Sequence, residues 1–120
     1  MLPYLYSEGV HAGRITLERL TEIVAAAPAR RFGIENRKGR LAPGFDADFV
    51  VLDPDERWTV RAAELHNLNR YTPLEGWTLT GRVRAVYLRG ERVYARGAGG
   101  GEEFAPPGTG RWVRRETRAA

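Results

Sequence analysis

The sequence predicts an α+β fold, with helices in its first third and short antiparallel β-strands in the rest. Apolar residues recur at helical spacing only before Gly33. After Gly33, short runs of strand formers alternate with turns rich in Gly, Asn and Pro. Because helices precede strands instead of alternating with them, the order argues against a series of βαβ units. A length of 120 residues predicts one domain at most.

The clearest predicted helix runs from Leu17 to Ala26. Thr16 is a good N-cap, and Glu18 favours the positive end of the helix dipole. One face of this helix is apolar, with Leu17, Leu20, Val24 and Ala27. We expect Pro28 to end the helix and to start a short second one, Ala29–Phe32.

Strand formers gather in several places after the helices. Phe49–Leu52 is continuously apolar, which predicts a strand covered on both faces. Thr78–Leu88 and Arg92–Tyr94 are typical of a β-hairpin with a tight turn at Arg89–Gly90. Three weaker predictions are a short strand at Trp58–Val60, a flexible connector at Gly97–Gly101 and a last strand or anchor at Trp112–Val113.

Composition excludes several classes of site. The chain has no Cys, so it forms no disulfide and offers no thiolate for metal binding or catalysis. It has two His, whereas a catalytic zinc site usually takes three protein ligands rich in His. No apolar run approaches 18 residues and no signal peptide is readable, so we expect a cytoplasmic protein with no membrane partner.

Several motifs together resemble one known family. They are Gly9–His11, Ile15–Leu20, Pro28–Ile34, the block KGRLAPGFDADFVVLD at Lys38–Asp53, the loop Tyr71–Gly76, the hairpin at Arg89–Gly90 and the ending Gly108–Arg114. Over nearly the whole chain they resemble the C-terminal segment of the cyclic amidohydrolases, in the branch of allantoinase, dihydroorotase and hydantoinase. The ending is most similar to that of allantoinase.

The resemblance implies a division of the chain and a role for it. Residues 1–36 would be the last helices of a TIM barrel, and residues 37–120 the C-terminal portion of a small β-sandwich with an extended basic tail. The parent family hydrolyses C–N bonds of cyclic amides and ureides with one or two zinc ions. Its metal ligands lie outside the matching segment, so the resemblance implies no catalytic, cofactor-binding or metal-binding residue here. We therefore expect a chain that is inactive alone and that pairs with a barrel portion or with copies of itself.

Individual polar residues are also candidates for a site. His11 and His66 lie on different predicted elements without a carboxylate at metal-binding spacing, so we interpret them as surface or packing residues. The carboxylates Asp46, Asp48, Asp53 and Asp55 lack the Gly and Glu of a calcium-binding loop. We expect Asp46 and Asp48 to shape a turn through hydrogen bonds to the backbone.

Three further features have a structural and a functional interpretation. Glu75 lies in an aromatic loop without an identifiable catalytic partner, which favours a role in loop structure. Gly97–Gly101 lacks the Gly-Lys-Ser/Thr ending of a phosphate-binding loop. A basic tail, namely Arg111, Trp112, Arg114, Arg115 and Arg118, is the feature that would support nucleic-acid binding. Two alternatives to the hydrolase segment thus stay open: a non-catalytic binding or oligomerisation module and, less favoured, a nucleic-acid-binding domain.

Overall fold

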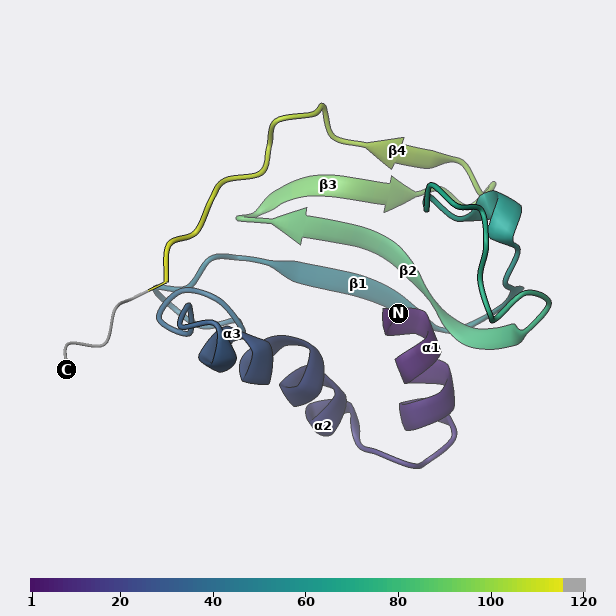
Figure 1. Ribbon diagram of the computed structural model, residues 1–120, viewed down its shortest axis with the longest axis horizontal. Coiled ribbons are helices and arrows are strands. Elements are labelled where there is room, and N and C mark those ends of the chain that lie inside the picture. The colour runs from purple at the N-terminus through teal and green to yellow at the C-terminus, as the bar shows by residue number, and fades with distance from the viewer. Residues whose placement is uncertain (116–120) are drawn as a thin grey trace.

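A computed structural model describes residues 1–115 and shows two helical segments followed by a four-stranded antiparallel sheet (Figure 1). This arrangement confirms the α+β prediction. The helical elements are α1 (Leu2–Leu5), η1 (Tyr6–His11), α2 (Leu17–Thr21), η2 (Glu22–Ala26), α3 (Ala27–Arg31) and the short η3 (Ala62–Glu64). The strands, hydrogen-bonded in chain order, are β1 (Phe49–Thr59), β2 (Thr78–Leu88), β3 (Glu91–Arg96) and β4 (Glu102–Phe104).

The first helical segment, α1 with the wider π-helical turns of η1, packs against β2. Ser7 is buried there, and its Oγ accepts a hydrogen bond of 3.1 Å from the backbone N–H of Thr80. The ring of Tyr6 lies against Gly81, where an added Cβ would be only 2.3 Å from Tyr6 Cδ1. Glycine at position 81 therefore lets the helix approach the sheet closely.

The second helical segment runs without interruption through α2, η2 and α3. Thr16 caps it as predicted, because its Oγ1 accepts a hydrogen bond from the backbone N–H of Arg19. The expectation that Pro28 ends this helix is wrong. A proline ring normally clashes with the carbonyl four residues earlier, here that of Val24. Val24 lies in the wider π-helical turns of η2, which accommodate the ring, so the helix continues to Arg31.

The sheet is built on long strands β1 and β2. Phe49 pairs with Tyr87 at one end, where their rings stack at 4.4 Å between centroids, and Thr59 pairs with Thr78 at the other. Trp58 thus belongs to the end of β1 and not to a separate strand. The register shifts between Asp53 and Arg57, around Pro54, as is usual for proline in an edge strand.

The turns between the later strands confirm one prediction and define a second hairpin. Arg89 and Gly90 have φ values of 51° and 80°, which gives the tight turn predicted between β2 and β3. Gly97–Gly101 closes a second hairpin, with the backbone N–H of Gly97 donating to the carbonyl of Gly101 at 2.9 Å. The segment therefore forms a hydrogen-bonded turn, and its flexibility stays a prediction. Trp112 is 87% exposed and lies in no strand, so the predicted last strand or anchor is wrong.

The chain buries little of its apolar surface. Within residues 1–115, the buried hydrophobic side chains are Leu20, Ala29, Val60 and Leu79. The accessible surface is 8929 Å², whereas a compact monomer of 13.5 kDa has about 6,500 Å². The radius of gyration, 16.0 Å, likewise exceeds the value of about 13.6 Å expected for 120 residues. None of the helices in the described part of the chain is long and apolar enough to cross a membrane.

Strand β1 shows this openness most clearly. Val50 and Val51 are each 44% exposed. Successive side chains of a strand point to opposite faces, so the strand is open on both. The prediction that Phe49–Leu52 is covered on both faces is therefore wrong for this chain by itself.

Candidate functional site

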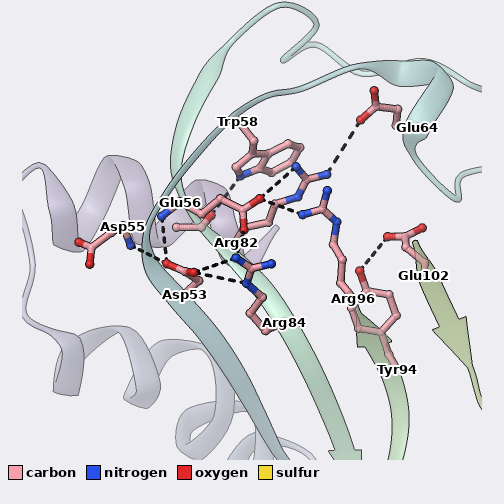
Figure 2. A network of polar contacts seen from close by, with 11 residues as sticks. Asp53, Asp55, Glu56, Trp58, Glu64, Arg82, Arg84, Tyr94, Arg96 and Glu102 are labelled. Carbon is pink, nitrogen blue, oxygen red and sulfur yellow. Dashed lines mark hydrogen bonds and ion pairs between the residues drawn. The ribbon is translucent and has the colours of Figure 1, made fainter. Parts of the chain in front are cut away.

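The most extensive polar cluster in the described chain is a charged network that crosses β1, β2 and β3 (Figure 2). Glu56 lies at its centre. Arg96 Nη1 donates to Glu56 Oε1 at 2.8 Å, and Arg82 Nη1 is 3.5 Å from the same oxygen. Arg84 Nη2 lies 3.0 Å from Glu56 Oε2 and 3.0 Å from Asp53 Oδ2. Arg82 also reaches Glu64 at 4.0 Å, so three guanidinium groups face three carboxylates.

Local backbone structure explains how Glu56 comes to face these arginines. The side chain of Asp53 accepts hydrogen bonds of 3.0 Å from the backbone N–H groups of Asp55 and Glu56, and so forms a turn around Pro54. The Arg84 guanidinium, followed by these N–H donors, holds the pKa of Asp53 below its ordinary value. Asp53 is therefore ionised at neutral pH and serves as a structural acceptor.

An aromatic residue closes one side of the network. The guanidinium of Arg82 lies over the ring of Trp58, 4.5 Å from its centroid, in a cation–π contact. Trp58 Nε1 donates to the carbonyl of Gly81 at 3.1 Å. Arg82 thus stacks on a ring that is itself held in place, which favours a fixed network over a mobile one.

A second chain of polar contacts joins the long loop after β1 to strand β4. His66 Nε2 is 2.8 Å from Glu102 Oε2, and the Tyr94 hydroxyl donates to Glu102 Oε1 at 2.7 Å. The Tyr94 hydrogen bond, with a contribution from His66, keeps the pKa of Glu102 below its ordinary value. Burial, and then the carboxylate of Glu102, raises the pKa of Tyr94. His11 is exposed at the end of η1, on a different element from His66.

A third cluster fixes the loop before β1. Lys38, the only lysine of the chain, contacts Asp46 at 2.8 Å and also pairs with Asp48. Burial acts to lower the pKa of Lys38, but hydrogen bonds to the two carboxylates outweigh it and raise that pKa. Asp48 Oδ1 accepts a 2.8 Å hydrogen bond from the backbone N–H of Arg89, as predicted for a turn-shaping residue. The Asp46 carboxylate contacts the side chains of Lys38 and Arg37 instead of the backbone.

The remaining candidates lie apart from these clusters. Glu75 Oε2 accepts a 2.6 Å hydrogen bond from the backbone N–H of Ala62 and so holds together the two ends of its loop, in agreement with the structural interpretation. In the tail, Arg111, Arg114 and Arg115 are exposed, whereas Arg118 lies outside the described residues. Nucleic-acid binding by these residues stays a prediction.

The chemistry of these clusters is that of structural ion pairs. Asp53 and Glu56 each face at least one guanidinium group, so each takes part in an ion pair within the sheet. Among residues 1–115, no group of three or more His, Asp or Glu side chains is arranged to hold a metal ion. The network itself escaped sequence reasoning, because Asp53 and Arg84 are far apart in the sequence and meet only through the register of β1 and β2.

Comparisons with known proteins agree with the motifs. A model of the amidohydrolase family matches residues 11–94. The D-phenylhydantoinase of Escherichia coli strain K12 / DH10B is 41% identical over 112 residues, which are 93% of this chain and 23% of that relative. The chain thus spans about a quarter of the length of the curated relatives it matches.

Solved structures give the same result. The D-hydantoinase of Bacillus sp. AR9 has a TM-score of 0.81 at 37% identity and covers 99% of this chain and 25% of its own. The L-hydantoinase (dihydropyrimidinase) of Arthrobacter aurescens has a TM-score of 0.74 at 40% identity and covers 77% of this chain and 20% of its own. These relatives are hydantoinases, so the expected likeness to allantoinase is corrected to a likeness to hydantoinase. With a family model that matches most of its length, the chain belongs to the amidohydrolase family.

Proposed function

We propose that this chain is the C-terminal portion of a hydantoinase-type hydrolase, which opens a cyclic amide or ureide at a C–N bond. The support is its identity of about two in five residues with a D-phenylhydantoinase four times its length. The fold match to a quarter of a D-hydantoinase supports the same role. The substrate class of the whole hydrolase is taken from these relatives.

The proposed contribution of the chain is structural. Residues 1–36 would complete the helices of a barrel, and residues 37–120 would form one part of a β-sandwich. Metal ions, for which zinc is our prediction, would be held by the rest of the hydrolase. Residues 1–115 do not fit a metal centre, because they bring no suitable group of ligands together. We therefore assign no step of the hydrolysis to a residue of this chain.

One observation carries the proposal most strongly. The chain exposes about 2,400 Å² more surface than a compact monomer of its mass, whereas a standard protein–protein interface buries about 800 Å² per partner. Three times the standard area is typical of a segment that packs permanently against the rest of a larger fold. We propose the barrel portion of the hydrolase as its partner.

A chimera tests the proposal. Residues 1–120 would replace the matching segment of the E. coli D-phenylhydantoinase, and hydrolysis of phenylhydantoin would be measured with the chimera, with the parent and with the parent lacking that segment. We expect the chimera to be folded and active and the truncated parent to be inactive.

The isolated chain is the matched control. We expect it to be folded but to show no turnover of phenylhydantoin, allantoin or dihydroorotate with added zinc. Stoichiometric metal binding with turnover by the isolated chain would overturn the structural role. A chimera that folds no better than the truncated parent would overturn the proposed place of the chain in a hydantoinase.

A further inference from the structure

The segment that follows β4 carries positive charge that the rest of the described chain does not neutralise. Between Ala105 and Arg115 the sequence has three arginines, Arg111, Arg114 and Arg115, and no acidic residue. All three are exposed, and none of them pairs with a carboxylate of residues 1–115. The four arginines of β2 and β3, by contrast, all pair with carboxylates. The segment therefore presents free positive charge to an anionic ligand.

Two contacts fix the base of this segment. The backbone N–H of Ala105 donates to the carbonyl of Val93 at 3.0 Å, and Arg89 Nη2 donates to the carbonyl of Thr109 at 2.5 Å. Beyond Thr109, residues 110–115 form no helix or strand and run on as an extended trace (Figure 1). The arginines thus stand on a short arm with a fixed base, which loses less entropy on binding than a wholly free tail would.

An exposed indole lies among these charges. Trp112 is 87% exposed and directly follows Arg111. The other two tryptophans of the chain, Trp58 and Trp77, each lie against another side chain of the fold. A ring that projects into solvent beside free guanidinium groups offers a flat face on which an unpaired base can stack, while the guanidinium groups attract phosphates.

This combination favours a single strand of nucleic acid over other polyanions. An acidic peptide would satisfy the guanidinium groups but offers no base to Trp112. A membrane-binding segment needs a broad apolar face, whereas the arm supplies only Trp112 and Val113. In a duplex the bases are already stacked and are read by a helix or a β-ribbon in a groove, and residues 105–115 form neither. Residues 111–115 span at most about 17 Å, which matches about five nucleotides of a stacked strand.

We propose that residues 109–115 bind single-stranded nucleic acid, with Trp112 stacked on a base and Arg111, Arg114 and Arg115 in contact with phosphates. The contact is independent of base sequence, because every base has a flat face and phosphate contacts carry no sequence information. Three phosphate contacts predict that the logarithm of the binding constant falls with the logarithm of the salt concentration with a slope of about −2. The inference goes beyond the proposed hydrolase role and does not rest on it.

Fluorescence anisotropy of short labelled oligonucleotides with the complete 120-residue chain tests the inference. We expect an oligothymidine to bind in about 50 mM salt and its binding to weaken about 20-fold in about 200 mM salt. An oligouridine of the same length shows whether the site accepts RNA as well as DNA. Failure of both oligonucleotides to bind in the lower salt concentration would overturn the inference.

Charge variants locate the contact. In the triple variant Arg111→Gln, Arg114→Gln and Arg115→Gln, we expect oligothymidine binding to weaken at least about tenfold and the salt dependence to disappear. The matched control removes the same charge from three exposed arginines outside the segment, by Arg19→Gln, Arg31→Gln and Arg57→Gln. The control should keep the slope of about −2. Equal losses in the two triple variants would show diffuse attraction to the whole surface and would overturn the assignment to this segment.

The indole has its own test. Trp112→Ala should weaken oligothymidine binding about tenfold, as loss of one base-stacking contact does, while Trp112→Phe should retain most of it. Tyr71→Ala is the matched control, because Tyr71 is 70% exposed in a different loop. If Tyr71→Ala weakens binding as much as Trp112→Ala does, the stacking contact is not specific to this segment and the inference fails.

Other ligands and the chimera complete the test. Oligoglutamate of equal charge and phosphatidylserine vesicles should bind less tightly than oligothymidine at the same salt concentration, and tighter binding of either would overturn the assignment to nucleic acid. Binding by the isolated chain but not by an active chimera would show that the rest of the hydrolase covers the arm. That result would overturn the inference and leave the proposed function standing. An inactive chimera that still binds oligothymidine would overturn the proposed function and leave the inference standing.

Discussion

The first half of strand β1, Phe49–Leu52, and its second half, up to Thr59, differ in how many of their groups find partners within this chain. In the second half, Glu56 meets three arginines and Trp58 is fixed by a hydrogen bond and a stacked guanidinium. In the first half, Val50 and Val51 are half-exposed and the outer backbone has no partner within residues 1–115. The comparison teaches that this segment pairs its own charges but leaves its apolar side chains to be covered by something else.

The largest effect is expected at Gly81, where the first helical segment packs against β2. Gly81→Ala would place a Cβ 2.3 Å from Tyr6 Cδ1 at a φ of 95°, which should lower the free energy of unfolding by about 3 kcal/mol. Denaturation with urea measures this loss. Gly90→Ala is the control, because φ is also positive there but no atom lies within 4 Å of the added Cβ, so we expect about 1 kcal/mol. Equal losses would contradict the close contact.

The network itself should show the next largest effect. Glu56→Gln leaves Arg82, Arg84 and Arg96 without their shared carboxylate, and we expect a loss of about 2 kcal/mol in the free energy of unfolding. Glu103→Gln is the matched control, since it removes only an exposed contact with Arg92 worth less than about 0.5 kcal/mol. If the two variants are equally stable, the network is not a structural centre.

A variant at Val51, in the half-exposed first half of β1, tests the comparison directly. Val51→Ala should cost the isolated chain only about 0.5 kcal/mol, because the side chain is already 44% exposed. In the chimera, where we propose that the rest of the hydrolase packs against this chain, the same change should cost about 2 kcal/mol. Thermal unfolding of both pairs measures the difference, and identical costs would mean that the chimera leaves this half uncovered.

Acid should weaken the contacts that Asp53 makes in the network. The pKa of Asp53 is lower in the folded chain than its ordinary value, chiefly because of Arg84. The stability that Asp53 contributes is therefore present above an unfolded pKa of about 3.9 and is lost as the pH falls through the folded pKa. Unfolding measured between pH 6 and pH 2 should show a shallower loss for Asp53→Asn than for the unmodified chain. Parallel curves would argue against the Asp53–Arg84 pair.

The smallest effect is expected at the loop held by His66. Because the His66–Glu102 contact is exposed, His66→Gln should cost less than about 0.5 kcal/mol in unfolding, but should speed tryptic cleavage after Arg70 in the same loop. His11→Gln, on a different element, should leave that cleavage unchanged. Unaltered cleavage in the His66 variant would show that the loop is held only by the contact that joins its two ends.

The sequence predicts the features that depend on neighbouring residues. The cap at Thr16 and the turn at Arg89–Gly90 follow from local preferences, and both are confirmed. The continuation of the helix through Pro28 could not be predicted, because it depends on the wider turns just before the proline. The three-residue strand β4 was missed because its pairing with β3, and not its composition, defines it.

The error at Val50 and Val51 has a different origin. An apolar run predicts burial in the complete fold for which a sequence was selected, whereas the exposed fraction refers to this chain alone. The network around Glu56 was missed for a third reason. Its members come from three strands, so their meeting depends on long-range register, which no local pattern encodes.

Lys38 has one further consequence. It carries the only ε-amino group of the chain, and its side chain is 14% exposed between Asp46 and Asp48. An amine-reactive reagent can therefore modify a side chain at this one position, and should do so faster when the loop before β1 opens. The rate of that reaction would report, at a single site and without mutation, how often the segment that leads into the open strand comes loose.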